Sequence, residues 1–208
     1  DVSLDYLLAA EEILFSNSVL LRSDRVCEIG AGFGRTCLAI LSKYNISEYI
    51  VIDLPEMLSL SKAYLKSVLS ADAYRRITFV DSRMYSSIID VDLVINIDSM
   101  QEMSFSAAVN YLSWISENSK YFFSKNAMGK YSPTDIDLVV RDDKEYEAAL
   151  KMGLVSAVFP LFDSDAQMDA KSIYHQSYCP KGFQLVKEQR GFGQYLSYGL
   201  VMFENVSN

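Results

Sequence analysis

Seven residues, Glu-Ile-Gly-Ala-Gly-Phe-Gly at positions 28–34, combine one acidic side chain with three glycines. The apolar residues before and among them predict a buried strand over residues 26–29, and the pattern after them predicts a helix over residues 35–44. Glycine lacks a Cβ, so such a turn can come close to a ligand, and the N–H groups that begin the helix point toward it. This strand, turn and helix are typical of a cradle for a nucleotide-type cofactor.

The spacing of the glycines separates two kinds of cofactor. Gly30, Gly32 and Gly34 follow the pattern G-x-G-x-G, whereas a dinucleotide site uses G-x-G-x-x-G. Glu28 adds a negative charge where a pyrophosphate would lie, which disfavours a cofactor with a pyrophosphate. The same charge suits a cofactor that carries an ammonium and a sulfonium group.

Two further acids each end a predicted strand: Asp53 ends the strand predicted over residues 49–53, and Asp81 ends the strand predicted over residues 77–81. Asp53 follows the glycines by about 20 residues, where folds of this kind place a carboxylate on ribose hydroxyls. Ligands of parallel sheets bind at the carboxyl ends of the strands, so we expect both acids at the binding edge. Either acid could instead cap the turn or helix that follows it.

A polar cluster at residues 98–103 follows another predicted strand, which spans residues 91–98. Asp98 and Glu102 in this cluster can accept a proton, and so can His175, the only histidine of the chain. These three residues are the candidate general bases, whereas Gln101 could only orient a substrate. A surface or capping role is the main alternative for His175.

Strand and helix patterns alternate four times along the chain. Such alternation predicts a doubly wound, mostly parallel sheet with right-handed crossovers, a Rossmann-like α/β fold. Further expected elements are helices at residues 2–21, from residue 55 to about 69, at 104–119 and at 143–152, a strand at 121–124, a mixed stretch at 154–182, and a hairpin of residues 184–188 and 196–204 joined by Gly191 and Gly193. We expect one domain with a helical cap (1–22), a cofactor-binding core (23–125), a variable substrate-side region (126–183) and a terminal antiparallel hairpin (184–208).

Composition excludes several classes of partner. The chain has 208 residues, half of them hydrophobic, with a formal charge of −8, and its acidic surface disfavours DNA or RNA as a partner. It contains no apolar run long enough for a membrane span and no secretory leader, so we expect a cytoplasmic protein. Asp163, Asp165 and Asp169 lack the glycine and terminal Glu of a calcium loop, so we expect a solvated acidic loop there and no metal site.

Three motifs resemble those of class I S-adenosylmethionine-dependent methyltransferases. The pattern E-x-G-x-G-x-G at residues 28–34 resembles motif I of that superfamily. The segments IDLPEML at 52–58 and INIDSMQEM at 95–103 resemble the second and strand-four motifs of a bacterial family of sugar O-methyltransferases. The resemblance covers roughly the first 125 residues, and it implies the class I methyltransferase fold, S-adenosylmethionine as cofactor and a sugar or nucleotide-sugar as acceptor.

The same resemblance implies roles for individual residues. Glu28 and the three glycines would line the methionine end of the cofactor, Asp53 would bind the ribose, and Asp81 with Ser82 would contact the adenine edge. The other residues of the implied cofactor site are Ala31, Phe33, Leu54, Asn96 and Ile97.

Methyl transfer to a hydroxyl is an in-line displacement in which the hydroxyl also loses a proton. Asp98 and Glu102 lie inside the resembling motif and therefore rank above His175 as the base. The alternatives are a methyltransferase for a small molecule other than a sugar, a catalytically silent binding module and, least favoured, an NAD(P)-dependent oxidoreductase. The sequence says nothing of the oligomeric state.

Overall fold

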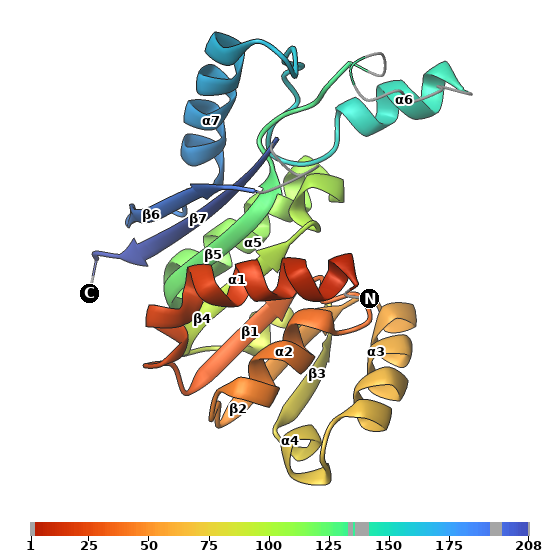
Figure 1. Cartoon of the computed structure of the whole chain (residues 1–208), viewed down its shortest axis with the longest axis vertical. Helices are drawn as coiled ribbons and strands as arrows, with labels where there is room; N and C mark the ends of the chain where they lie inside the picture. The colour runs from red at the N-terminus through yellow and green to blue at the C-terminus, as the bar shows by residue number, and fades with distance from the viewer. Residues whose placement is uncertain (1–2, 133–134, 136–141, 192–196, 208) are drawn as a thin grey trace. The chain divides into compact units, whose positions relative to one another are not determined.

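The computed structural model describes residues 3–132, 135, 142–191 and 197–207. In this part of the chain, seven strands form a mostly parallel sheet with the order β3-β2-β1-β4-β5-β7-β6 (Figure 1). The strands are β1 (Arg25–Ile29), β2 (Glu48–Asp53), β3 (Ile77–Asp81), β4 (Val91–Ile97), β5 (Ser119–Ala127), β6 (Phe183–Arg190) and β7 (Tyr198–Asn205). The helices are α1 (Leu4–Leu20), α2 (Arg35–Lys43), α3 (Pro55–Val68), α4 (Ala71–Arg75), α5 (Phe105–Asn118), α6 (Asp143–Leu150) and α7 (Ser164–Tyr178). The contacts divide the chain into two compact units, Asp1–Ile97 with Glu117–Phe123, and Asp98–Ser116 with Ser124–Asn208.

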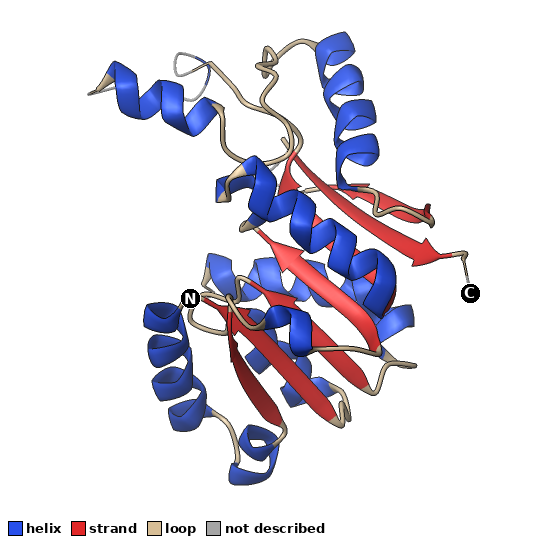
Figure 2. Cartoon of the chain, turned by 180° about the vertical axis from the view of Figure 1, so that it is seen from behind, coloured by secondary structure: helices blue, strands red, loops and turns tan. Residues whose placement is uncertain are grey.

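The first unit is built on parallel strands with apolar side chains on both faces. β1 pairs in parallel with β2 and β4, and β2 pairs in parallel with β3. Tyr49, Ile50, Val51 and Ile52 of β2 are fully buried, as expected for a strand covered on both sides. Helices α1 and α2 pack together on one face of these strands (Figures 1 and 2), and α3 contacts β2 and β3.

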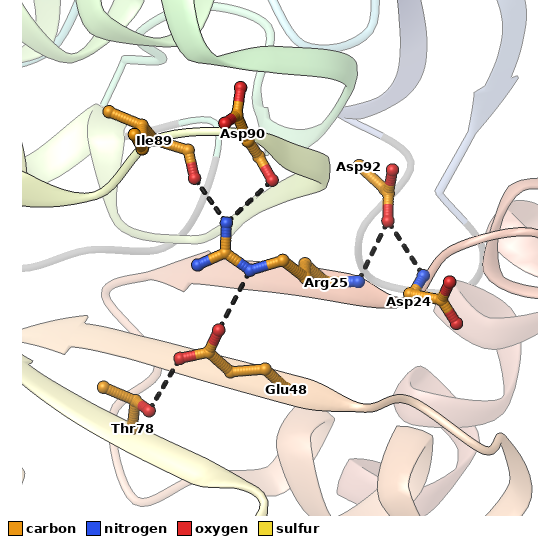
Figure 3. A network of polar contacts seen from close by, with 7 residues as sticks. All are labelled: Asp24, Arg25, Glu48, Thr78, Ile89, Asp90 and Asp92. Atoms are coloured by element: carbon orange, nitrogen blue, oxygen red, sulfur yellow. Dashed lines mark hydrogen bonds and ion pairs between the residues drawn. The ribbon is translucent and has the colours of Figure 1, made fainter.

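Polar side chains bind the amino-terminal ends of these strands to one another (Figure 3). Arg25 Nε donates a hydrogen bond to Glu48 Oε2 at 2.9 Å, and the Thr78 hydroxyl donates to Glu48 Oε1 at 2.8 Å. Asp92 Oδ2 accepts the backbone N–H groups of Asp24 and Arg25 at 2.9 and 3.0 Å. The charged groups at this edge are therefore satisfied within the fold, and the candidate binding residues lie at the opposite, carboxyl-terminal edge.

The second unit is organised around Tyr174 of α7. Its ring is fully buried, and its hydroxyl donates to Gly199 O at 3.0 Å and accepts the N–H of Asn126 at 3.2 Å. The hydroxyl of Ser124 lies 2.9 Å from the same oxygen. These contacts attach α7 to β5 and β7, and β7 pairs in antiparallel fashion with β6 to form the terminal hairpin.

The expected doubly wound sheet with a C-terminal antiparallel hairpin is confirmed. Two helices were not predicted, and the expectation of an acidic loop was wrong. Residues 71–75 and 164–178 form helices that the sequence patterns did not predict, so Asp165 and Asp169 lie on α7 and Asp163 caps it, where an acidic loop was expected. Residues 2, 193 and 196 of the expected elements lie outside the described residues, and the single-domain division stays a prediction.

None of the helices among the described residues has the length and apolar character that crossing a membrane requires.

Candidate functional site

The glycine-rich turn connects β1 to α2 through three residues with positive φ. Gly30, Gly32 and Gly34 have φ values of 73°, 58° and 98°, a region that side-chain-bearing residues rarely adopt. A Cβ on Gly34 would lie 2.8 Å from the Leu65 side chain, so close packing of the turn on α3 requires glycine there. A Cβ on Gly32 would meet nothing within 4 Å, so the space over the middle of the turn is open. Gly34 also closes the turn with a bond from its N–H to Ala31 O at 2.9 Å.

Asp53 connects the end of β2 to this turn. Its Oδ2 accepts the N–H of Gly32 and its Oδ1 accepts the N–H of Leu54, at 2.9 and 2.8 Å. Burial raises the pKa of Asp53, while the two N–H donors act in the opposite direction. Leu54, the next residue, is exposed. The structure thus brings Asp53 to the glycine turn, and it shows that part of its carboxylate holds the turn in place.

Glu28 lies in the core of the first unit rather than on its surface. Only 2 % of the residue is exposed, and its Oε2 accepts a 2.8 Å hydrogen bond from the hydroxyl of Tyr49 on β2. Burial raises the pKa of Glu28 to about 7, although hydrogen bonds from Tyr49 and Thr36 and the nearby charge of Arg35 lower it. Glu28 is therefore a buried group that can change its charge near neutral pH.

A buried ion pair attaches α1 to the first residue of α2. Arg35 Nη2 lies 2.9 Å from Glu12 Oε1, and Arg35 Nη1 donates to Asp5 O at 3.0 Å. On the other side of the turn, the ring of Phe33 meets the ring of Tyr64 edge to face, with 5.1 Å between centroids. The turn is thus held between α1 and α3.

Asp81 ends β3 directly opposite Asp53 in the strand register. Ser82 continues the ladder, because its N–H donates to Asp53 O at 2.9 Å. The carboxylate of Asp81 is held by Arg83, whose Nε lies 2.9 Å from Oδ1 and whose Nη2 lies 2.5 Å from Oδ2. These bonds hold the pKa of Asp81 at about 2. Sequence reasoning expected Asp81 here but did not single out Arg83.

Asn96 and Ile97 end β4, beside β1. Both are buried, and Asn96 Nδ2 donates to Ile29 O at 2.9 Å, the carbonyl that precedes the glycine turn. The structure therefore brings together in the first unit the turn residues, Glu28, Asp53, Asp81, Ser82 and the end of β4.

The remaining candidates lie in the second unit, beginning with Asp98, the next residue after Ile97. Asp98 has a φ of 55°, which is uncommon for a residue other than glycine but tolerated by aspartate and asparagine. Its N–H donates to Lys125 O at 2.9 Å. Gln101 Nε2 donates to Asp98 Oδ1 at 3.3 Å and to the hydroxyl of Tyr198 at 3.1 Å.

The other end of the Gln101 amide determines its orientation. Gln101 Oε1 accepts the backbone N–H of Ala127 at 2.6 Å. A backbone N–H can only donate, so the atom that faces it is the oxygen and the NH₂ group must face Asp98 and Tyr198. Both N–H donors of Gln101 are thus used within the protein, which leaves this amide the role of holding Asp98.

Glu102 and Lys130 lie near this cluster. Glu102 is exposed at the end of a short 3₁₀ turn, Met100–Glu102. Lys130 Nζ donates to Gln101 O at 3.3 Å. Burial lowers the pKa of Lys130, and the charge of Glu102 opposes this change. Neither Lys130 nor Tyr198 was singled out from the sequence, because nothing local marks them.

His175 belongs to a different group of side chains. Its Nε2 lies 3.2 Å from Glu188 Oε2, and Glu188 also pairs with Lys171, both across α7 and β6. Burial lowers the pKa of His175, and Glu188 opposes this. The structure therefore groups Asp98 with Gln101, and it gives His175 partners outside that group.

A family model described as the O-methyltransferase domain matches residues 4–116, more than half of the chain. The chain belongs to the O-methyltransferase domain family. The match spans α1, the glycine turn, Asp53, Asp81 and the Asp98 cluster. At the level of the family, the expectation of an S-adenosylmethionine-dependent methyltransferase is confirmed, and S-adenosylmethionine is confirmed as the cofactor. The residues that bind the cofactor are still predictions.

Solved structures of methyltransferases share the fold of this O-methyltransferase domain at low sequence identity. The methyltransferase domain of bacterial CtHen1 is 12 % identical with a TM-score of 0.63, and the match covers 97 % of this chain and 100 % of that one. A Nostoc punctiforme protein assigned as an O-methyltransferase is 13 % identical with a TM-score of 0.63, covering 95 % of this chain and 56 % of that one. Magnesium protoporphyrin IX methyltransferase from Synechocystis, with bound S-adenosylhomocysteine, is 12 % identical with a TM-score of 0.57, covering 97 % and 81 %. No curated protein matches the sequence.

The geometry of the first unit fits the cofactor of this domain. Open space over Gly32 leaves the backbone of the turn accessible, and the carboxylate of Asp53 stands at its edge. A purine ribonucleoside attached to a charged amino acid needs such a combination of accessible backbone and carboxylates.

Proposed function

We propose that the chain is an S-adenosylmethionine-dependent methyltransferase that methylates a hydroxyl group of a sugar or a sugar-containing small molecule such as a nucleotide-sugar, in the cytoplasm. The observation that best supports methylation of a hydroxyl is the Asp98 carboxylate, which accepts a hydrogen bond from Gln101. Asp98 follows β4 directly and has a left-handed backbone conformation. The sugar comes from the sequence resemblance of residues 52–58 and 95–103. The acidic composition disfavours a nucleic acid as the acceptor.

In this proposal the first unit binds the cofactor. The backbone of Gly30, Gly32 and Gly34 lies along its methionine end, and the buried Glu28 contributes negative charge beneath the turn in its ionised form. Asp53 accepts the ribose hydroxyls at the acceptor positions that its bonds to Gly32 and Leu54 leave open. The other proposed contacts are Ala31, Phe33, Leu54, Asp81, Ser82, Asn96 and Ile97.

Asp98, the residue that directly follows β4, is the proposed proton acceptor for the hydroxyl of the substrate. When bound, S-adenosylmethionine provides an electrophilic methyl group on its sulfonium. Asp98 takes the proton from the hydroxyl as the oxygen attacks, and Gln101 positions Asp98. Glu102 is the second candidate, because it follows Asp98 by four residues in the same motif and is exposed. His175 ranks below both, because its contacts are with Glu188.

The first experiment tests the cofactor site by calorimetry with S-adenosylhomocysteine. Asp53→Ala should weaken binding by roughly ten- to a hundred-fold, because charge-assisted hydrogen bonds of about 1.5 to 3 kcal/mol are lost. Asp92→Ala is the matched control, since Asp92 also accepts two backbone N–H groups but at the opposite end of the strands. Equal affinity of the Asp53 variant and wild type would remove Asp53 from the site.

The second experiment tests the base by measuring turnover. Asp98→Asn keeps the shape of the side chain and the tolerance for positive φ, and it should lower turnover by roughly 10²- to 10⁴-fold with cofactor affinity unchanged. Glu102→Gln should have a small effect. The reverse result would assign the base to Glu102, and full turnover of both variants would turn attention to His175→Ala and to a chelator control.

The third experiment identifies the acceptor. Monosaccharides, nucleotide-sugars and phenols are incubated with labelled S-adenosylmethionine, and methylated products are detected by mass spectrometry. Methylation of a sugar hydroxyl supports the proposal. Methylation of phenols alone would favour a different small molecule, tight cofactor binding without any product would favour a silent binding module, and binding of NADH alone would favour an oxidoreductase.

A further inference from the structure

Arg83 presents a flat cation at the carboxyl-terminal edge of β3. Its guanidinium makes two side-chain bonds to the Asp81 carboxylate, and its backbone N–H donates a third bond to Asp81 Oδ1 at 2.9 Å. This two-pronged geometry makes the guanidinium coplanar with the carboxylate. The plane of Arg83 is therefore fixed, although the side chain is 78 % exposed.

Asp81 retains limited capacity to accept further hydrogen bonds. Oδ1 already accepts two N–H groups and Oδ2 accepts one, so one acceptor position remains, on Oδ2. The carboxylate alone can thus receive one donor from a ligand. The larger surface offered to a ligand at this edge is the guanidinium plane of Arg83.

The surroundings of Arg83 fit a flat, partly apolar ligand. The hydrogen bond to Asp81 raises the pKa of Arg83 most, and the negative charge of Glu56 in the first turn of α3 adds to this, so Arg83 lies within electrostatic reach of the start of α3. Leu54 and Met84 are exposed by 57 % and 60 %, and they follow the ends of β2 and β3. Within the described parts of the chain, no aromatic ring covers the guanidinium of Arg83.

We propose that the guanidinium plane of Arg83, held by Asp81, is the surface on which the adenine ring of the cofactor stacks. The flat, weakly hydrated guanidinium of arginine stacks face to face on planar π systems, whereas the compact ammonium of lysine has no plane to stack and offers only its charge. Asp81 and Asp53 are register partners on neighbouring strands, so a nucleoside whose ribose binds Asp53 places its base at the Asp81 and Arg83 edge. This inference rests on the proposed cofactor site.

Calorimetry with S-adenosylhomocysteine and with adenosine tests the inference. Arg83→Ala should weaken the binding of both ligands by roughly three- to thirty-fold, the range expected for a cation stacked on an aromatic ring. Arg83→Lys should lose nearly as much, because it keeps the charge and removes the plane. Arg75→Ala is the matched control, since Arg75 forms a similar exposed pair with Asp72 at 3.1 Å, away from this edge.

A second measurement detects the contact itself. Nuclear Overhauser effects are expected between adenine H2 or H8 and the side-chain methylene protons of Arg83 in the complex. Wild-type affinity of Arg83→Ala, or full affinity of Arg83→Lys, would overturn the inference while a loss in Asp53→Ala left the cofactor site standing. If neither Asp53→Ala nor Arg83→Ala changed the affinity, the proposed cofactor site would fail, and the inference with it.

Discussion

Replacing Glu28 with glutamine should remove a pH dependence from the stability of the protein. Burial raises the pKa of Glu28 from its ordinary 4.5 to about 7 in the folded chain. A carboxyl group with a raised folded-state pKa stabilises the fold while it is protonated, so its contribution is complete below about pH 4.5 and is lost as the pH rises through about 7. Glutamine stays neutral at every pH and can still accept the hydrogen bond from Tyr49.

The magnitude follows from the two pKa values. Between about pH 5.5 and about pH 8, a single group with these values lowers the free energy of unfolding by about 2 kcal/mol. Wild type should therefore lose about 2 kcal/mol more than Glu28→Gln over this interval. Because Glu28 is buried, solvent screening reduces this figure little.

Urea unfolding followed by circular dichroism at several pH values measures the difference. Glu48→Gln is the matched control, because Glu48 lies on β2, the strand that pairs with the β1 strand of Glu28, but its side chain is about one-third exposed. This variant should follow the wild-type curve. Parallel curves for wild type and Glu28→Gln would show that Glu28 is ionised throughout the interval, and the argument from burial would be refuted.

Two further substitutions test the packing around the site. Gly34→Ala should destabilise the fold by about 1 to 3 kcal/mol, because φ is 98° and the new Cβ would meet Leu65 at 2.8 Å; a thermal melt equal to wild type would contradict this. Tyr174→Phe should cost about 1 to 3 kcal/mol in denaturant unfolding, because the N–H of Asn126 and Gly199 O lose a buried partner; an unchanged unfolding midpoint would show that the hydroxyl bonds are not needed.

The strands of the first unit were predictable because each is a short run of apolar residues bounded by turn signals. The strand predicted over residues 77–81 coincides with β3, and the predicted residues 49–53 differ from β2 by one position. Their burial on both faces leaves few alternatives for such runs. Helix boundaries also agreed closely where a cap or proline marked the start, as at Pro55.

The helix α7 was missed for a physical reason. Its buried residues are Gln167, Ala170, Tyr174 and Tyr178, which are spaced for a helix but are mostly polar or amphipathic. The side chain of Asp163 accepts the N–H groups of Asp165 and Ala166, and this capping role was available from the sequence. Acidic residues near a helix start were instead interpreted as a loop.

The site was predictable only where neighbours in sequence or in strand register make it. Asp53 beside Gly32 follows from the parallel pairing of β1 with β2. The contact of Gln101 with Tyr198 joins residues 97 positions apart, and no local pattern reveals it. The pairing of Asp81 with Arg83 is local, but charge alone does not distinguish it from an exposed pair such as Arg75 with Asp72.

The left-handed backbone of Asp98 has a consequence for how the protein can change over generations. Glycine at this position would relieve the conformational cost of a φ of 55°. It would also delete the carboxylate on which the proposed chemistry depends. Under the proposed mechanism, selection for relaxed backbone geometry and selection for activity oppose each other at this residue, so a stabilisation programme guided by backbone geometry alone would choose glycine there and remove the proposed base.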